Sequence, residues 1–198
     1  MATDKIPESG VILDVGKAGI MDIAAMIRTE PEILQFLSDN HFNYQRVEHP
    51  PVFTCAEAER PRPNITALST KNLFLCDKKG RKFYLAVTAC EKNMDFKQLA
   101  DKFGVSRLRF GSKEDLERLL GVNRGAVTML GLVNDLDHQV ELWIEAQTWS
   151  GENFLCHPLV NTATLVLSKS ALVRFFNLTG HIVHTFEEKL LSEVKPPN

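Results

Sequence analysis

The stretch CHPLVNTAT occupies residues 156–164 and joins two predicted strands, 140–146 and 164–167. A connection between strands needs turn formers, and the Pro and Asn of this stretch supply them. It does not also need an imidazole and further hydroxyl groups. Two interpretations remain open. Either Asn161 and Thr162 only hold the turn through local hydrogen bonds and His157 is a surface residue, or these polar groups line a pocket.

A second polar stretch favours the pocket. Ser69-Thr70-Lys71-Asn72 stands directly before the apolar run Leu73-Phe74-Leu75, which is typical of a strand. A lysine where a strand begins can reach the mouth of a pocket. The two stretches together therefore predict a binding site built around Lys71, Asn72 and His157.

A third feature is the loop Gly125-Ala126-Val127-Thr128. A glycine before a short β-branched run allows backbone N–H groups to approach a ligand closely. A tight turn that enters a strand would explain the same residues.

The hydrophobic pattern predicts one mixed α/β domain, in which hairpins join some strands and helices join others. A central mixed, largely antiparallel sheet flanked by helices is expected, rather than a doubly wound parallel sheet. We expect the domain at residues 29–186, between an extension at 1–28 and a polar tail at 187–198. The predicted strands are 44–47, 73–76, 82–88, 108–110, 140–146, 164–167 and 181–186, and the predicted helices are 31–40, 54–59, 95–103, 113–120 and 169–179, with a short one near 21–27.

The composition of 198 residues, 44% hydrophobic, suits one globular domain with a sizeable core. No apolar run is long enough to span a membrane, and the N-terminus lacks the pattern of a signal peptide, so a cytoplasmic protein is expected. The four cysteines form no C-x-x-C motif. We therefore expect reduced thiols and neither a zinc site nor a redox motif.

Positive charge is concentrated in one part of the chain. Residues 60–124 hold 15 of the 23 Lys and Arg residues but only 7 of the 25 Asp and Glu residues, a net charge of +8, against −10 for the remainder. Such segregation is typical of a surface that binds phosphate groups. Solvated faces of alternating charge are the competing explanation.

Several common types of site are unsupported. The chain has no G-x-G-x-x-G, P-loop or G-x-S-x-G motif, so neither a nucleotide cofactor nor a serine nucleophile is indicated. His181 and His184 are three residues apart and would lie on opposite faces of a strand, which argues against a shared metal. We expect no metal and no cofactor.

The motifs, taken in order, resemble those of the YbaK/prolyl-tRNA-synthetase-associated family, the free-standing relatives of the editing domain in bacterial prolyl-tRNA synthetase. The chain is most similar to the branch that removes alanine wrongly attached to proline tRNA. The matching motifs are VEHPP (47–51), S-x-KNLFL-x-D (69–77), LRF (108–110), G-x-VT (125–128), GL-x-ND (131–135), HP-x-x-N-x-x-T (157–164) and GH (180–181).

The resemblance implies a central mixed sheet flanked by helices and hydrolysis of the ester that joins an amino acid to tRNA. It implies an essential role for Lys71, backbone amides of residues 125–128 near the reacting carbonyl, and substrate contacts by four side chains: Asn72, His157, Asn161 and Thr164. Met129 departs from the family, which usually has proline at the end of this loop. Either other packing holds the loop or the activity is altered.

The expected function is therefore deacylation of mischarged alanyl-tRNA(Pro). The expected partners are the acceptor end of tRNA(Pro) and, as a further candidate, prolyl-tRNA synthetase; no membrane partner is expected. Two alternatives stay open. Met129 favours a non-catalytic module that binds tRNA or synthetase, and a deacylase for cysteinyl- or seryl-tRNA is the other, although Asn72 favours alanine.

Overall fold

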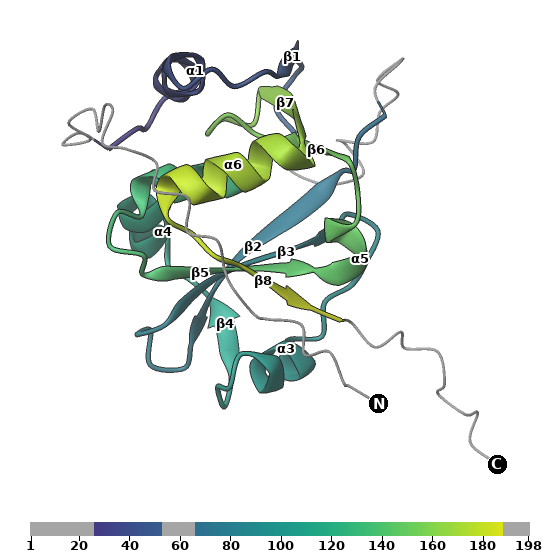
Figure 1. Cartoon of the computed structure of the whole chain (residues 1–198). Coiled ribbons are helices and arrows are strands. Elements are labelled where there is room, and N and C mark those ends of the chain that lie inside the picture. The colour runs from purple at the N-terminus through teal and green to yellow at the C-terminus, as the bar shows by residue number, and fades with distance from the viewer. Residues whose placement is uncertain (1–25, 53–65, 188–198) are drawn as a thin grey trace, which may run out of the picture.

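The computed structural model describes residues 26–52 and 66–187, and its strands form two sheets (Figure 1). The central sheet has five strands in the order β4-β2-β3-β5-β8. Its β2 pairs antiparallel with β3 and β4, whereas β3–β5 and β5–β8 are parallel. The strands are β2 (Thr70–Asp77), β3 (Phe83–Ala89), β4 (Leu108–Phe110), β5 (Val140–Glu145) and β8 (Val183–Phe186).

A small antiparallel sheet of order β1-β7-β6 accompanies the central sheet. Its strands are β1 (Gln45–Glu48), β6 (Asn153–Cys156) and β7 (Ala163–Ser168). A bridge between Leu68 and Phe154 ties the chain just before β2 to β6. The beginning of β2 therefore lies beside the small sheet, and its other end runs into the β2–β3 hairpin on the far side (Figure 1).

Local capping explains where most helices begin and end. The Ser112 hydroxyl accepts from the Asp115 amide at the start of α4, and the Ser168 hydroxyl accepts from the Ala171 amide at the start of α6. Gly121 and Gly180, which follow the two helices, have positive φ. The helices are α1 (Glu30–Asp39), α3 (Phe96–Lys102), α4 (Lys113–Leu120), α5 (Ala146–Trp149) and α6 (Lys169–Thr179), with a 3-10 helix η1 (Met129–Asn134).

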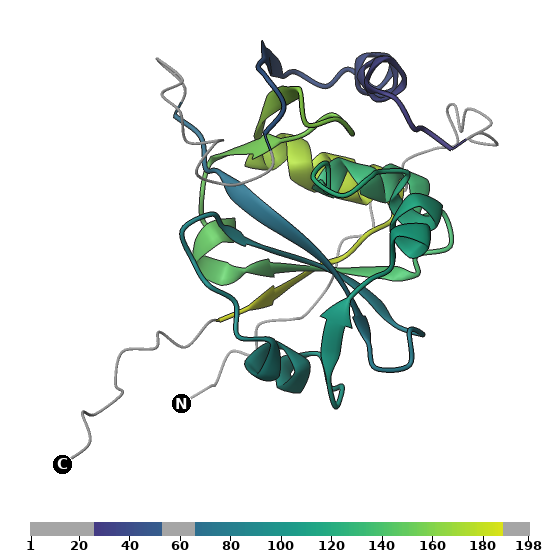
Figure 2. The ribbon, with the colours of Figure 1, turned by 180° about the vertical axis from the view of Figure 1, so that it is seen from behind.

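The two faces of the central sheet carry different cores. One face, with the small sheet, α1, α4, α6 and η1, forms the large core, which includes Phe74 and Leu85. The other face packs mainly against α3 and forms the small core, which includes Leu75 and Tyr84. Figures 1 and 2 show α6 and α4 on one side of the sheet and α3 on the other. Consecutive residues of β2 thus enter different cores, as strand geometry requires.

The structure confirms the mixed α/β fold and corrects several details. Residues 129–134 form η1 instead of entering a strand, because the Thr128 hydroxyl accepts from the Leu130 amide and starts a helical turn. Both α5 and β6 were missing from the prediction. The expectation of reduced thiols is wrong for Cys90, which is disulfide-bonded, whereas Cys76 and Cys156 are free and buried.

The predicted helix at 54–59 and most of the one near 21–27 fall outside the described residues, as do most of the predicted extension and tail. In the part of the chain that the structure describes, no helix is long and apolar enough to cross a membrane.

Candidate active site

Lys71 lies on β2 beside the end of β3, directly across from Thr88. It is half-buried, and its Nζ donates to the backbone carbonyl of Lys92 in the turn that follows β3. An ammonium has three protons to donate. With one of them engaged, Lys71 keeps donors for a bound molecule at this end of the sheet.

Buried polar atoms without partners lie on both faces of the sheet at its Lys71 end. In the described ranges, four buried side-chain atoms make no hydrogen bond, and three belong to Thr70, Asn72 and Thr88. These are two hydroxyl oxygens and the Asn72 Oδ1. Such groups cost free energy when unpaired, so native proteins rarely keep several together without a ligand or a function. These three oxygen atoms are therefore available to form hydrogen bonds with polar groups of a ligand at this end of the sheet.

The structure does not place Lys71 and Asn72 on the same face. Leu73 and Leu75 belong with the small core, whereas Phe74 and Cys76 belong to the large one. Strand alternation therefore directs Lys71 toward the α3 side and Asn72 toward the α6 side. A molecule in contact with both must lie across the end of the sheet, where the chain before β2 departs toward β6.

An ion pair holds the turn that contacts Lys71. The Lys92 Nζ lies 2.9 Å from the Glu145 carboxylate and donates to Gln147 Oε1 at 2.6 Å. Burial of Glu145 opposes ionisation, but hydrogen bonds from the Thr148 side chain, Lys92 and the Thr148 amide outweigh it and lower the pKa of Glu145. The Lys92–Glu145 ion pair therefore fixes the position of the Lys92 backbone carbonyl, which accepts from Lys71.

The loop at 125–128 keeps backbone donors available. Gly125 has φ of 88°, and the Ala126 amide donates to the Asn123 carbonyl at 3.1 Å. Within the described ranges, the amides of Gly125, Val127 and Thr128 donate to no acceptor. Neighbouring amides without acceptors suit a site that stabilises a developing negative charge.

Packing holds the end of this loop. The Met129 side chain is 1% exposed and belongs to the large core. A flexible methionine is immobilised here by its burial, so this position does not depend on proline for its stiffness.

Residues 157–164 hold the neighbouring segment 49–52. Asn161 donates through Nδ2 to the Val52 carbonyl at 3.2 Å, and Thr164 lies with Oγ1 2.8 Å from His49 Nε2. The His49 Nδ1 lies 2.9 Å from the Pro50 carbonyl, which can only accept. A ring protonated on Nδ1 therefore satisfies both contacts, with Nε2 accepting from the Thr164 hydroxyl.

His157 is half-buried in this stretch, and its ring centroid lies 6.3 Å from that of His49. The buried Leu159, with φ of 64°, sets the path of the loop. Asn161 and Thr164 thus hold the segment 49–52 through hydrogen bonds that span 109 and 115 positions, rather than through the local bonds of a turn. His157 stays a candidate for substrate contact.

No hydrogen bond or ion pair between described residues joins Lys71 to residues 125–128 or to His157. In the described part of the chain, the predicted site residues are therefore not linked to one another by polar contacts. Two other types of site gain no support: no three His, Cys, Asp or Glu side chains in the described ranges cluster as a metal site would, and burial raises the pKa of the Cys156 thiol to about 12, which disfavours a thiolate nucleophile.

Sequence reasoning missed four residues of this site: Thr88, Lys92, Glu145 and Thr148. Their contacts join segments far apart in the chain; the Lys92–Glu145 pair, for example, spans 53 positions. The only local signal is the position of Glu145 at the end of an alternating strand, where a carboxylate can cap a following helix.

Comparison with known proteins adds an independent finding. The sequence profile described as the aminoacyl-tRNA editing domain matches residues 49–175. The prolyl-tRNA editing protein ProX of Acetoanaerobium sticklandii is 34% identical over 155 residues, which cover 78% of this chain and 94% of ProX. The prolyl-tRNA synthetase associated domain-containing protein 1 of Danio rerio is 31% identical over 176 residues, 88% of this chain and 95% of that protein.

Solved structures share the fold. A protein described as a candidate trans-editing enzyme for prolyl-tRNA synthetase superimposes with a TM-score of 0.61 over 82% of this chain and 99% of its own, at 19% identity. The hypothetical protein APE2540 gives 0.60 over 77% and 97%, also at 19% identity. The matched profile covers more than half of the chain, and the resemblance inferred from the motifs is confirmed: the chain belongs to the aminoacyl-tRNA editing domain family.

Proposed function

We propose that this protein hydrolyses the ester of a mischarged aminoacyl-tRNA, and that its substrate is alanyl-tRNA(Pro). The observation that carries the proposal is the set of buried, unpartnered polar atoms on both faces of the sheet at the end where Lys71 lies. The names of the two relatives supply the substrate class, since both refer to prolyl-tRNA or its synthetase.

The chemistry requires positioning more than a protein nucleophile. Water adds to the ester carbonyl, the carbon–oxygen bond to the ribose breaks, and the ribose oxygen leaves with a proton as a hydroxyl group. The negative charge that develops on the carbonyl oxygen would meet the amides of Gly125, Val127 and Thr128. Stabilisation by fixed backbone donors and correct placement of the water would supply most of the rate enhancement.

In this proposal Lys71 binds the ribose-phosphate end of the substrate or stabilises the charge that develops there. Its position at the beginning of β2, with a hydrogen bond donated to the Lys92 carbonyl, fixes the ammonium before the substrate arrives. Asn72 approaches from the other face of the sheet, and its Oδ1 would accept from a substrate donor such as the alanine ammonium. His157 would complete the wall of the pocket.

Selectivity would follow from size. A synthetase pocket made for proline cannot strongly reject the smaller alanine, whereas a second, tighter pocket can admit alanine and exclude proline. The buried Met129 and Leu159 belong to the same core and would make that pocket rigid. A pocket that distinguishes alanine from proline by one or two carbon atoms must be rigid.

The test is deacylation of labelled alanyl-tRNA(Pro) in the presence of EDTA, with prolyl-tRNA(Pro), alanyl-tRNA(Ala), cysteinyl-tRNA and seryl-tRNA as comparison substrates. Wild type should release alanine from tRNA(Pro). Lys71→Ala should lower kcat/KM by about 100-fold, because an electrostatic contact to the reacting region is lost. Lys102→Ala, at an exposed α3 lysine that forms no ion pair with the described part of the chain, is the matched control and should retain wild-type rates.

The other outcomes separate the alternatives. Release of cysteine or serine in preference to alanine would replace the proposed substrate. Binding of tRNA without hydrolysis of any ester would identify a non-catalytic module. Wild-type turnover by Lys71→Ala would show that the role given to this lysine is wrong.

A further inference from the structure

The surface opposite the candidate active site is strongly basic. We define the basic hairpin surface as Lys78, Lys79, Arg81 and Lys82 of the β2–β3 turn with Arg107 and Arg109 of the β4 edge. All six are exposed, and among the described residues none takes part in an ion pair. Unpaired cations on one surface raise the local electrostatic potential.

Pairing between strands brings these cations together. In the β2–β4 pair, Asp77 lies across from Leu108 and Cys76 across from Arg109. Arg107, which precedes Leu108, therefore lies beside the β2–β3 turn. The Arg109 Nη2 also passes close to the turn, since a Cβ atom added at Gly80 would lie 2.9 Å from it. The hairpin and β4 therefore present one continuous surface.

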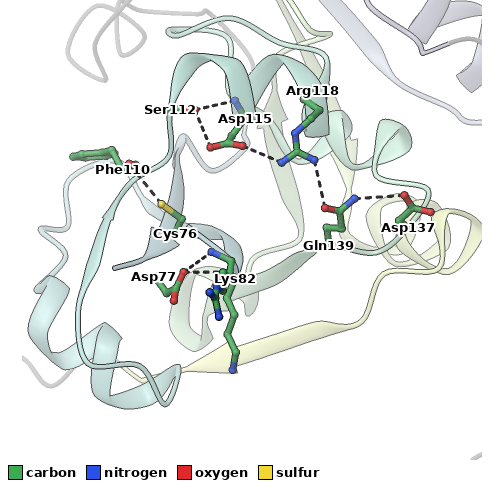
Figure 3. Close-up of polar contacts among 10 residues, drawn as sticks. Cys76, Asp77, Lys82, Phe110, Ser112, Asp115, Arg118, Asp137 and Gln139 are labelled. Carbon is green, nitrogen blue, oxygen red and sulfur yellow. Dashed lines mark hydrogen bonds and ion pairs between the residues drawn. The ribbon is translucent and has the colours of Figure 1, made fainter. Parts of the chain in front are cut away.

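The nearby carboxylates are already engaged (Figure 3). Asp77 accepts from the backbone amides of Arg81 and Lys82 at 2.7 and 3.2 Å. Asp115 accepts from the Ser112 hydroxyl at 2.8 Å and pairs with Arg118 at 2.9 Å. Two further carboxylates accept from neutral groups: Asp137 from the Gln139 amide, and Glu141 from the Trp143 indole.

The surface lies far from Lys71. Lys78 directly follows β2, and seven residue steps of extended chain lead from Lys71 to it, which corresponds to about 23 Å. A cation cluster at this distance cannot contact the reacting ester. It suits a ligand that carries phosphates at a fixed distance from that ester, as tRNA does where its base-paired acceptor stem begins beyond the unpaired 3′ end.

We infer that the basic hairpin surface binds the phosphate backbone of the double-stranded acceptor stem while the 3′ end occupies the site at Lys71. This inference rests on the proposed function for the identity of the RNA. Double-stranded RNA is recognised mainly through its shape and its phosphates, and exposed Lys and Arg side chains meet that need without reading sequence. The stem contact adds affinity, whereas the pocket selects the amino acid.

The test measures binding, so that it does not depend on catalysis. Affinities for an uncharged acceptor-stem minihelix and for a single-stranded oligonucleotide of the 3′ end are determined over a range of salt concentrations. Lys79→Glu and Lys82→Glu should each weaken minihelix binding about tenfold and reduce the salt slope by about one, while affinity for the single strand stays unchanged. Arg28→Glu is the control, because Arg28 is exposed, forms no ion pair with any described residue, lies near α1, and its reversal changes the net charge equally.

Wild-type minihelix affinity in both hairpin variants would overturn the inference. An equal loss for minihelix and single strand would also overturn it, since the surface would then hold the 3′ end. Weakened binding to vesicles of anionic phospholipid, with minihelix binding intact, would assign the surface to a membrane instead. A wild-type protein that binds the minihelix through these residues but hydrolyses no ester would refute the proposed function and leave this inference standing.

Discussion

The two ends of the β2–β3 strand pair differ in how their polar and charged groups are buried and paired. At the Lys71 end, polar atoms are buried and several lack partners, although an ion pair holds the turn beside them. At the hairpin end, the cations are exposed and form no ion pairs with described residues, and the carboxylate of Asp77 accepts from backbone amides of the turn. The first end is suited to hold a small polar group tightly, and the second to attract a large polyanion.

This contrast shows that a strand pair can separate selection from attraction. Buried unpaired groups discriminate well, because a ligand that fails to satisfy them leaves the full desolvation cost. Exposed cations discriminate poorly but act at long range. Altering either end should therefore change different quantities, namely stability and turnover at one end, and affinity and its salt dependence at the other.

The largest effect on stability is expected from breaking the ion pair at the Lys71 end. Glu145→Ala leaves the Lys92 ammonium without its carboxylate and removes the cap of α5, because Glu145 also accepts from the Thr148 amide at 2.7 Å. We expect the free energy of unfolding to fall by about 3 kcal/mol. Urea unfolding followed by circular dichroism measures it.

An exposed ion pair provides the control. Glu117 lies 4.0 Å from Lys113 on the surface of α4, and Glu117→Ala should lower the free energy of unfolding by at most about 0.5 kcal/mol. Equal losses in the two variants would contradict the claim that the Lys92–Glu145 pair organises this end of the sheet.

A smaller effect, of opposite sign in two variants, tests the difference between a buried hydroxyl with partners and one without. Thr88 and Thr148 are both fully buried, but only the Thr148 hydroxyl has partners, accepting from the Ala89 amide at 2.9 Å and donating to Glu145 at 2.6 Å. Thr148→Val should lower the free energy of unfolding by about 2 kcal/mol. Thr88→Val should raise it by up to about 1 kcal/mol, because a methyl group replaces an unsatisfied hydroxyl.

The same urea titration measures both variants, and a deacylation assay of Thr88→Val sharpens the result. A more stable but slower protein would place the Thr88 hydroxyl in the substrate site. A destabilised Thr88→Val protein would mean that this hydroxyl already has a partner, and the difference between the two ends of the strand pair would shrink accordingly.

Elements with local signals were the ones that the sequence predicted well. The predicted bounds of α4 and α6 match the structure because a serine cap and a following glycine mark both ends of each helix. By contrast, α5 and β6 have four residues each, and tertiary contacts define them: Glu145 caps α5, and Leu68 pairs with β6. Such short elements carry too little periodicity to be recognised.

The candidate site divides in the same way. Lys71, Asn72 and His157 stand out because polar residues beside apolar runs are visible in the sequence. Thr88 and Lys92 are invisible by the same criteria, because their importance comes from the register with β2 and from the contact with Glu145. The opposite orientations of Lys71 and Asn72 could only be recognised once β2 was shown to include both residues.

The smallest effect is expected at the hairpin, where Asp77→Asn removes a charge but keeps an acceptor. The hydrogen bond from the Arg81 amide, supported by others from the turn, lowers the pKa of Asp77 below its usual value. A carboxyl with a lowered pKa stabilises the fold above its unfolded-state pKa of about 4, and that contribution is lost as the pH falls through the folded-state value. Wild type should therefore exceed Asp77→Asn in stability more at pH 7 than at pH 3. Urea unfolding at both pH values measures this difference in stability, and an equal difference at the two pH values would show that the turn does not hold the ionised form.

Asp77 accepts from backbone amides of the turn rather than from the cations. The substitution should therefore leave minihelix affinity unchanged or make it slightly tighter. Weaker RNA binding by Asp77→Asn would instead mean that this carboxylate arranges the cations, and that the two ends of the strand pair are less different than their contacts indicate.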